Sequence, residues 1–155
     1  PDNLEALLGL AEVSLQRHSI DEFWQNIELI TKYSAVTSKQ VELELRALFL
    51  QHKFQSVVDK FALITDSQSN IKINKETLRL VEAAKLLMTE QNGVVALNAF
   101  IKQTESFVTE SPIELNDLDL LLVLLKETSA NDEHIVWSQE KEKRIAKLQL
   151  THFDS

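Results

Sequence analysis

Apolar residues recur at intervals of three and four along most of the chain. Clear examples are Leu4, Leu7, Leu8, Ala11 and Leu15, then Val41, Leu45 and Leu48, then Leu80, Ala84 and Leu87. Because an α-helix has 3.6 residues per turn, this spacing gathers apolar side chains on one helical face. It predicts helices near residues 3–17, 20–33, 38–51, 53–66, 75–90, 93–108, 113–128 and 139–150. The pattern leaves 130–138 ambiguous, and the short alternating segment 70–74 is predicted to be a loop.

Helix start signals divide this pattern. In a capping box, a Ser or Thr is followed three residues later by Glu or Gln, and each side chain accepts or donates at the other's backbone. Such boxes begin at Ser19, Thr37 and Ser111. Pro112 strengthens the third, because proline sacrifices no hydrogen bond at the first helical position. Asn74 and Asn92 are predicted to be simpler N-caps.

A helix pair recurs along the chain when Ser19, Lys53 and Asn92 are aligned as position zero, with spacings of 34 and 39 residues. Small, aliphatic or aromatic residues then align on both helices. The sets are Phe23, Val57 and Ala96 at +4; Trp24, Val58 and Leu97 at +5; Ile27, Phe61 and Phe100 at +8; Leu7, Val41 and Leu80 at −12; and Val13, Ala47 and Leu86 at −6. Such periods are typical of stacked helix pairs. We therefore expect an all-α fold, a right-handed α-solenoid of seven or eight antiparallel helices.

The register predicts two regions. Residues 1–128 form a helical-repeat domain, with units at about 1–36, 37–73 and 74–111 and a half unit at 112–128. Residues 129–155 form a C-terminal helix with a narrow apolar stripe, Ile145 and Leu148, and otherwise charge. This helix suits either the polar cap that a solenoid needs or a linker to further chain.

Composition narrows the possible functions. With two glycines among 155 residues, the chain offers no Gly-rich loop for a nucleotide phosphate. It contains no cysteine, which removes disulfides, thiolate zinc sites and cysteine nucleophiles and fits an intracellular protein. The longest apolar run, 120–125, is far below the roughly 20 residues that cross a bilayer, so we expect no membrane insertion. The chain begins at Pro1 rather than Met, and we expect a piece of a longer protein.

Residues that commonly carry catalysis are poorly placed for it. His18 and His52 share a repeat position, −1, where Gln91 stands in the third unit, and are expected in turns about 10 Å apart. On a helix, the carboxylates of Glu42/Glu44 and of Asp117/Asp119 point in roughly opposite directions and cannot act as an acid–base pair. No spacing of His and acidic residues suits a metal. We expect no enzyme activity, no metal and no small-molecule cofactor.

The net charge of −8 is unevenly distributed. Residues 1–37 carry a net charge of −4, residues 38–108 of +1 and residues 109–155 of −5. Both ends would repel a phosphate backbone. This distribution disfavours general nucleic-acid binding.

The stretch LFLQHKFQSVVDKF, residues 48–61, resembles the helix–turn–helix centre of a pentatricopeptide repeat. Pro1-Asp2 and Ser111-Pro112 resemble the junctions that precede a new repeat in that family. The similarity covers about residues 1–128. It implies a scaffold segment of an organellar RNA-processing, RNA-stability or translation factor that contacts single-stranded RNA, located in mitochondria or otherwise in the cytoplasm.

The resemblance also implies which positions would meet RNA. The family's base-reading position on the first helix falls at Leu8, Glu42 and Val81, where two aliphatic side chains cannot discriminate a base edge. One position earlier in the alignment than −6, Arg46 and Lys85 are candidate phosphate contacts, with solvated polar faces as the alternative interpretation. The aromatic residues Phe23, Trp24, Phe61 and Phe100 are expected in the core rather than as base-stacking platforms.

A second hypothesis belongs to a different class. The 34-residue period is shared by tetratricopeptide repeats, which implies a protein-interaction module that binds a peptide or partner helix in a groove. Trp137 lies outside the repeats beside a polar segment. It is a candidate for capping the solenoid or for contacting a partner.

Overall fold

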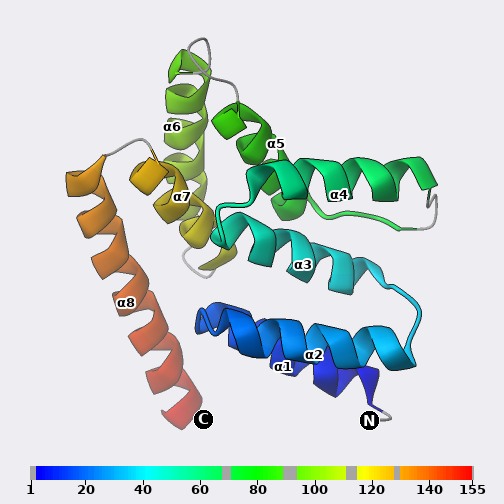
Figure 1. Ribbon diagram of the computed structural model, residues 1–155. Helices are drawn as coiled ribbons and strands as arrows, with labels where there is room; N and C mark the ends of the chain where they lie inside the picture. Colours follow the sequence, from blue (N-terminus) through cyan, green and yellow to red (C-terminus); the bar gives the residue numbers. More distant parts are fainter. Residues whose placement is uncertain (1–2, 68–70, 89–93, 111–114, 128–129, 155) are drawn as a thin grey trace. The chain divides into compact units, whose positions relative to one another are not determined.

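The computed structural model describes residues 3–67, 71–88, 94–110, 115–127 and 130–154, and within them it contains eight α-helices and no strand (Figure 1). The helices are α1 (Leu4–Gln16), α2 (Ile20–Tyr33), α3 (Ser38–Leu50), α4 (Phe54–Ser67), α5 (Lys75–Met88), α6 (Val94–Glu110), α7 (Leu115–Glu127) and α8 (Asn131–Asp154). The predicted all-α class is confirmed. Residues 71–74 are a loop as predicted, whereas the ambiguous segment 130–138 belongs almost entirely to the 24-residue helix α8.

The chain divides into two compact units, residues 1–84 and residues 85–155. In the first unit α1 packs on α2 and on α3, and α3 packs on α4; in the second, α7 packs on both α6 and α8. Contacts between helices that are neighbours in sequence therefore dominate each unit.

The predicted N-caps have mixed outcomes. The Thr37 hydroxyl accepts the backbone N–H of Gln40 at 3.2 Å, and the Asn74 side chain accepts that of Thr77 at 2.9 Å, so both caps are confirmed. Ser19 stands at the N-cap of α2 but makes no capping hydrogen bond, so the capping-box prediction there is wrong. The predicted caps at Ser111 and Asn92 lie outside the described residues.

The turns that join α1 to α2 and α3 to α4 repeat each other hydrogen bond for hydrogen bond, 34 residues apart. Ser19 donates its N–H to the carbonyl of Ser14 at 2.8 Å, and Lys53 donates to Leu48 at 2.9 Å. His18 and His52, the residues just before, have φ of 58° and 61°. This six-residue closure over a left-handed residue is the Schellman ending of a helix. The shared turn position predicted for the two histidines is confirmed.

The same closure recurs in the second unit. Between α7 and α8, Ala130 donates its N–H to the carbonyl of Leu125 at 2.9 Å. Three helix pairs thus use one way of ending the first helix and starting the second.

The left-handed backbone at His18 and His52 gives the first testable prediction. A Cβ makes this conformation costly, and glycine removes that cost. We expect His18→Gly to raise the free energy of unfolding by about 0.5–1 kcal/mol, as helix-cap optimisation commonly does. His52→Gly should gain less, because the His52 ring also contacts the Phe54 ring at 5.7 Å. Urea midpoints measure both; a His18→Gly variant less stable than wild type would contradict the assignment.

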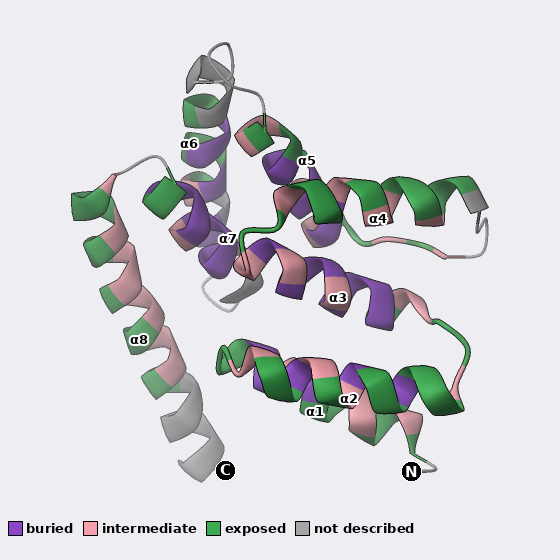
Figure 2. Ribbon diagram, in the orientation of Figure 1, coloured by how far each residue is buried: buried purple, intermediate pink, exposed green. Residues whose placement is uncertain are grey.

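The core of the first unit lies between α1, α2 and α3 (Figure 2). Its buried members are Ala11, Leu15, Phe23, Ile27, Ile30, Leu43 and Ala47. The aromatic pair Phe23–Trp24 meets edge to face, with ring centroids 5.0 Å apart, an arrangement that adds to simple burial. The core assignment of Phe23 and of the +4 position at Val57 is confirmed.

The repeat register is less uniform than predicted. At +8, Ile27 and Phe100 are buried but Phe61 is only half-buried. At −6, Ala47 is fully buried whereas Val13 is 42% exposed. The side chains of Ala96 and Leu97 lie outside the described residues. Position in the repeat therefore predicts the turn better than it predicts burial.

Helix α7 forms the centre of the second unit. Leu118, Leu121 and Leu124 are fully buried, and nearly every described residue of this helix is shielded from solvent. A helix that is apolar all round is one that neighbours cover on several sides. The buried carboxylate of Asp119 forms an ion pair with Lys141, which joins α7 to α8.

Candidate binding pocket

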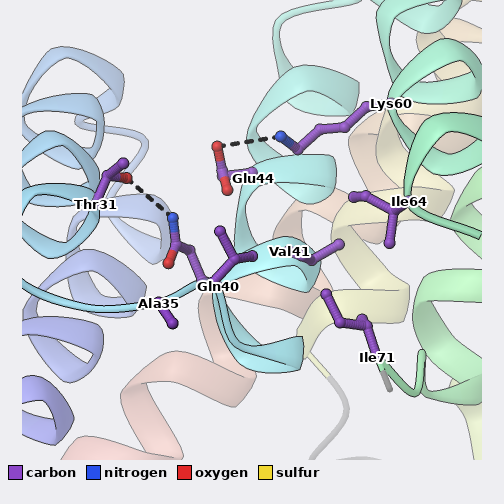
Figure 3. A pocket seen from close by; sticks show the side chains of 9 residues that line it. Thr31, Ala35, Gln40, Val41, Glu44, Lys60, Ile64 and Ile71 are labelled. Carbon is purple, nitrogen blue, oxygen red and sulfur yellow. Dashed lines mark hydrogen bonds and ion pairs between the residues drawn. The ribbon is translucent and has the colours of Figure 1, made fainter. Parts of the chain in front are cut away.

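A pocket of about 470 Å³ opens in the first unit (Figure 3). Its lining comes from four segments: the end of α2, the connection that follows it, one face of α3, and α4 with the loop after it. The lining residues are Thr31, Ala35, Val36, Gln40, Val41, Glu44, Lys60, Ile64 and Ile71. The volume is in the range of sites that bind small molecules or single peptide side chains.

Helix α3 supplies the floor of the pocket. Gln40 and Glu44 are one helical turn apart and therefore lie on the same face, with Val41 beside them. This helix is buried over most of its surface, including residues that are usually exposed, Gln40, Glu42 and Arg46. Burial of polar side chains on the floor means that each needs a hydrogen-bond partner.

The loop 71–74 is fixed to α3 by two hydrogen bonds. Lys72 donates its N–H to the hydroxyl of Ser38 at 3.1 Å, and Asn74 donates its N–H to a carboxylate oxygen of Glu42 at 2.9 Å. These bonds hold the loop against the start of α3. They thereby place Ile71 in the pocket wall.

Gln40 is the most buried polar residue of the pocket, with 2% of its surface exposed. Its Nε2 donates to the hydroxyl of Thr31 at 3.1 Å, and that hydroxyl donates in turn to the carbonyl of Ile27 at 2.9 Å. The Oε1 atom has no hydrogen-bond donor among the described residues. Gln40 thus links α3 to α2 with its nitrogen and leaves its oxygen as a buried acceptor.

The charges in the pocket balance. Lys60 Nζ lies 3.4 Å from Glu44 Oε1 and links α4 to α3 (Figure 3). The Glu44 side chain is 13% exposed and that of Lys60 31%. The rest of the lining is apolar apart from Thr31 and Gln40. The pocket is therefore a neutral, half-apolar site with one buried acceptor.

The side chains predicted to contact ligands lie elsewhere. Arg46 is on α3 but only 7% exposed, so its guanidinium is largely covered by protein. The solvated face that was its alternative interpretation is wrong for this residue. Lys85 is exposed on α5, and Trp137 is half-buried on α8. Arg46 belongs to the first unit and the other two to the second, and none of the three lines the pocket.

The positions aligned with base-reading residues are not presented to a ligand. Leu8 is half-buried, Val81 is 2% exposed, and Glu42 is 9% exposed. The Glu42 carboxylate holds the start of α5 through Asn74.

The carboxylate pairs act separately, as their helical spacing predicts. Glu42 bonds to the loop backbone and Glu44 to Lys60, on different sides of α3. Within the described ranges, no three His, Asp or Glu residues gather in a way that could hold a metal ion. In the same ranges, every helix is too short or too polar to span a membrane.

Glu42 gives a second prediction. Glu42→Ala removes the acceptor of the Asn74 N–H, and we expect a loss of about 1–3 kcal/mol in the free energy of unfolding. Glu42→Gln keeps an acceptor oxygen at the same place and should lose clearly less. Urea denaturation of both variants measures the difference; equal losses would show that the hydrogen bond contributes little.

The pocket residues carry weak signals in the sequence. Gln40 is recognisable as the third residue of the Thr37 capping box, but its side chain turns to Thr31 rather than back to the cap. Glu44 and Lys60 are 16 residues apart and meet only because α3 packs on α4. No local pattern predicts that contact.

Comparison of the chain with protein-family models, with curated proteins and with solved structures found no match. The resemblance to pentatricopeptide repeats therefore stays a prediction.

Proposed function

We propose that this chain is a non-enzymatic helical-repeat module that binds a protein partner, with the pocket between α2, α3 and α4 as its contact site. The observation that carries the proposal is the pocket itself. It combines an aliphatic wall, a buried acceptor and a balanced ion pair on a rigid helical floor. Such a mixture suits a peptide, which brings apolar side chains and backbone hydrogen-bonding groups together.

Charge supports a protein rather than RNA as the partner. The first unit holds 12 acidic and 9 basic residues, a net charge of −3. Nucleic-acid affinity depends on cations that reach phosphates, and Arg46 is mostly buried. The role in an organellar RNA factor is the weaker candidate on these grounds.

The arrangement of the repeats is part of the proposal. We infer that the helix pairs are antiparallel and stack as a right-handed solenoid. The matching turns at a 34-residue interval support this arrangement, because equal turns at equal spacing favour equal packing of successive pairs.

One pair of binding assays separates the two partner classes. A phage-displayed library of random 12-residue peptides is panned against the chain, and a random 20-nucleotide single-stranded RNA is titrated by fluorescence anisotropy. We expect enriched peptides that bind saturably at 200 mM salt, and RNA affinity that falls steeply between about 50 and 200 mM salt. Salt-tolerant RNA binding without peptide enrichment would overturn the proposal.

A further inference from the structure

The amide of Gln40 has only one orientation that satisfies its neighbour. A hydroxyl has a single proton, and Thr31 donates it to the carbonyl of Ile27 at 2.9 Å. Thr31 Oγ1 can therefore only accept from Gln40, so Gln40 must present Nε2 to it, at 3.1 Å. The Oε1 atom then necessarily faces away from Thr31, as an acceptor.

That acceptor is buried without a donor from the described part of the chain. A buried polar atom that makes no hydrogen bond is costly, and such atoms in folded proteins call for an explanation. Gln40 is at the same time a lining residue of the pocket. The pocket therefore has one unmet requirement, a hydrogen-bond donor.

The ion pair limits the charge of that donor. Glu44 and Lys60 neutralise each other at 3.4 Å within the same pocket. A cationic group would be repelled by Lys60 or would have to displace it, and an anionic group would face Glu44 and the acceptor of Gln40. An uncharged N–H meets neither penalty.

The opposite wall limits the shape of the ligand. Val41 comes from α3, Ile64 from α4 and Ile71 from the loop, and Figure 3 shows their side chains gathered on one side of the pocket. Branched aliphatic side chains favour an aliphatic neighbour, because burying apolar surface is favourable.

We infer that the pocket recognises an uncharged amide beside an aliphatic group: a partner peptide places an aliphatic side chain against Val41, Ile64 and Ile71 and donates an amide N–H to Gln40 Oε1. The inference rests on the proposed function, and it names the chemistry that the pocket selects. A backbone amide next to a Leu, Ile or Val residue has both features.

Three small probes of one shape test the chemistry directly. Isovaleramide, isovalerate and isopentylamine share a branched aliphatic end and differ in carrying a neutral amide, an anion or a cation. Each is titrated into the whole chain while the methyl resonances of Val41, Ile64 and Ile71 are followed by NMR. We expect saturable shifts with isovaleramide and at least tenfold weaker binding of the other two probes. Equal affinities, or no saturable shift, would overturn the inference.

Variants test the role of Gln40. Gln40→Leu removes the acceptor at similar size and should weaken isovaleramide binding at least tenfold. Gln40→Met removes it with a more flexible side chain, and serves if the leucine variant fails to fold. Gln55→Leu is the matched control, because Gln55 is exposed on α4 and bonds only to Asp59 among the described residues. Unchanged binding in a folded Gln40 variant would overturn the inference.

The outcomes separate this inference from the proposed function. Peptides selected by phage display that bind wild type and Gln40→Leu equally would leave protein binding intact and remove the amide contact. Conversely, if isovaleramide binds in the pocket but no peptide is enriched, the chemistry of the pocket stands and the proposed function fails.

Discussion

Phe23→Ala should lower the free energy of unfolding by about 3–5 kcal/mol, the cost of deleting a fully buried aromatic ring and leaving a cavity. Phe23 has no exposed surface, belongs to the cluster shared by α1, α2 and α3, and packs edge to face on Trp24. The urea midpoint at an unchanged slope gives the loss.

Phe61→Ala is the comparison that makes this prediction specific. The repeat register treats Phe61 as the +8 anchor of the second pair, but this ring is only half-buried. Since the transfer term scales with the area removed from water, Phe61→Ala should cost clearly less than Phe23→Ala. Equal losses would mean that α4 packs more tightly than the structure shows.

Lys141→Met should destabilise the second unit by about 3 kcal/mol, because it leaves a buried carboxylate without its cation. The pair joins α7 to α8, with side chains of Asp119 and Lys141 that are 7% and 15% exposed. Thermal or urea unfolding followed by circular dichroism measures the loss.

Two further variants control for other effects of the substitution. Lys143→Met makes the same change at an exposed position of α8 and should alter stability by less than about 0.5 kcal/mol. The double variant Asp119→Asn/Lys141→Met removes both charges and should recover much of the loss. A double variant no more stable than Lys141→Met would contradict a charge-based explanation.

Local signals in the sequence predict the helices well. Seven of the predicted helices begin and end within about three residues of α1–α7, since the 3.6-residue periodicity and the caps at Thr37 and Asn74 act within a few residues. The turn at His52 also follows from its alignment with His18. These features depend on neighbours in the chain, which the sequence states directly.

The pocket could not be predicted in the same way. Its ion pair needs α4 to lie on α3, and its buried acceptor needs Thr31 to use its proton on Ile27. Arg46 shows the same limit: the charge suggests a solvated position, but α3 is covered on several sides and buries it. Tertiary packing decides these cases, and no short-range pattern encodes it.

The central claim is that a partner peptide occupies the pocket, and a plug at its edge tests this directly. Ala35 is exposed in the connection after α2 and lines the pocket, whereas Ala62 is exposed on α4 and does not. A tryptophan at either place leaves the core untouched, and only the first can fill the pocket.

The measurement is the affinity of a phage-selected peptide for Ala35→Trp and Ala62→Trp, by fluorescence anisotropy at 200 mM salt. We predict a loss of at least about tenfold for Ala35→Trp, with affinity close to wild type for Ala62→Trp and wild-type urea midpoints for both. Equal peptide affinity for the two variants would contradict the account.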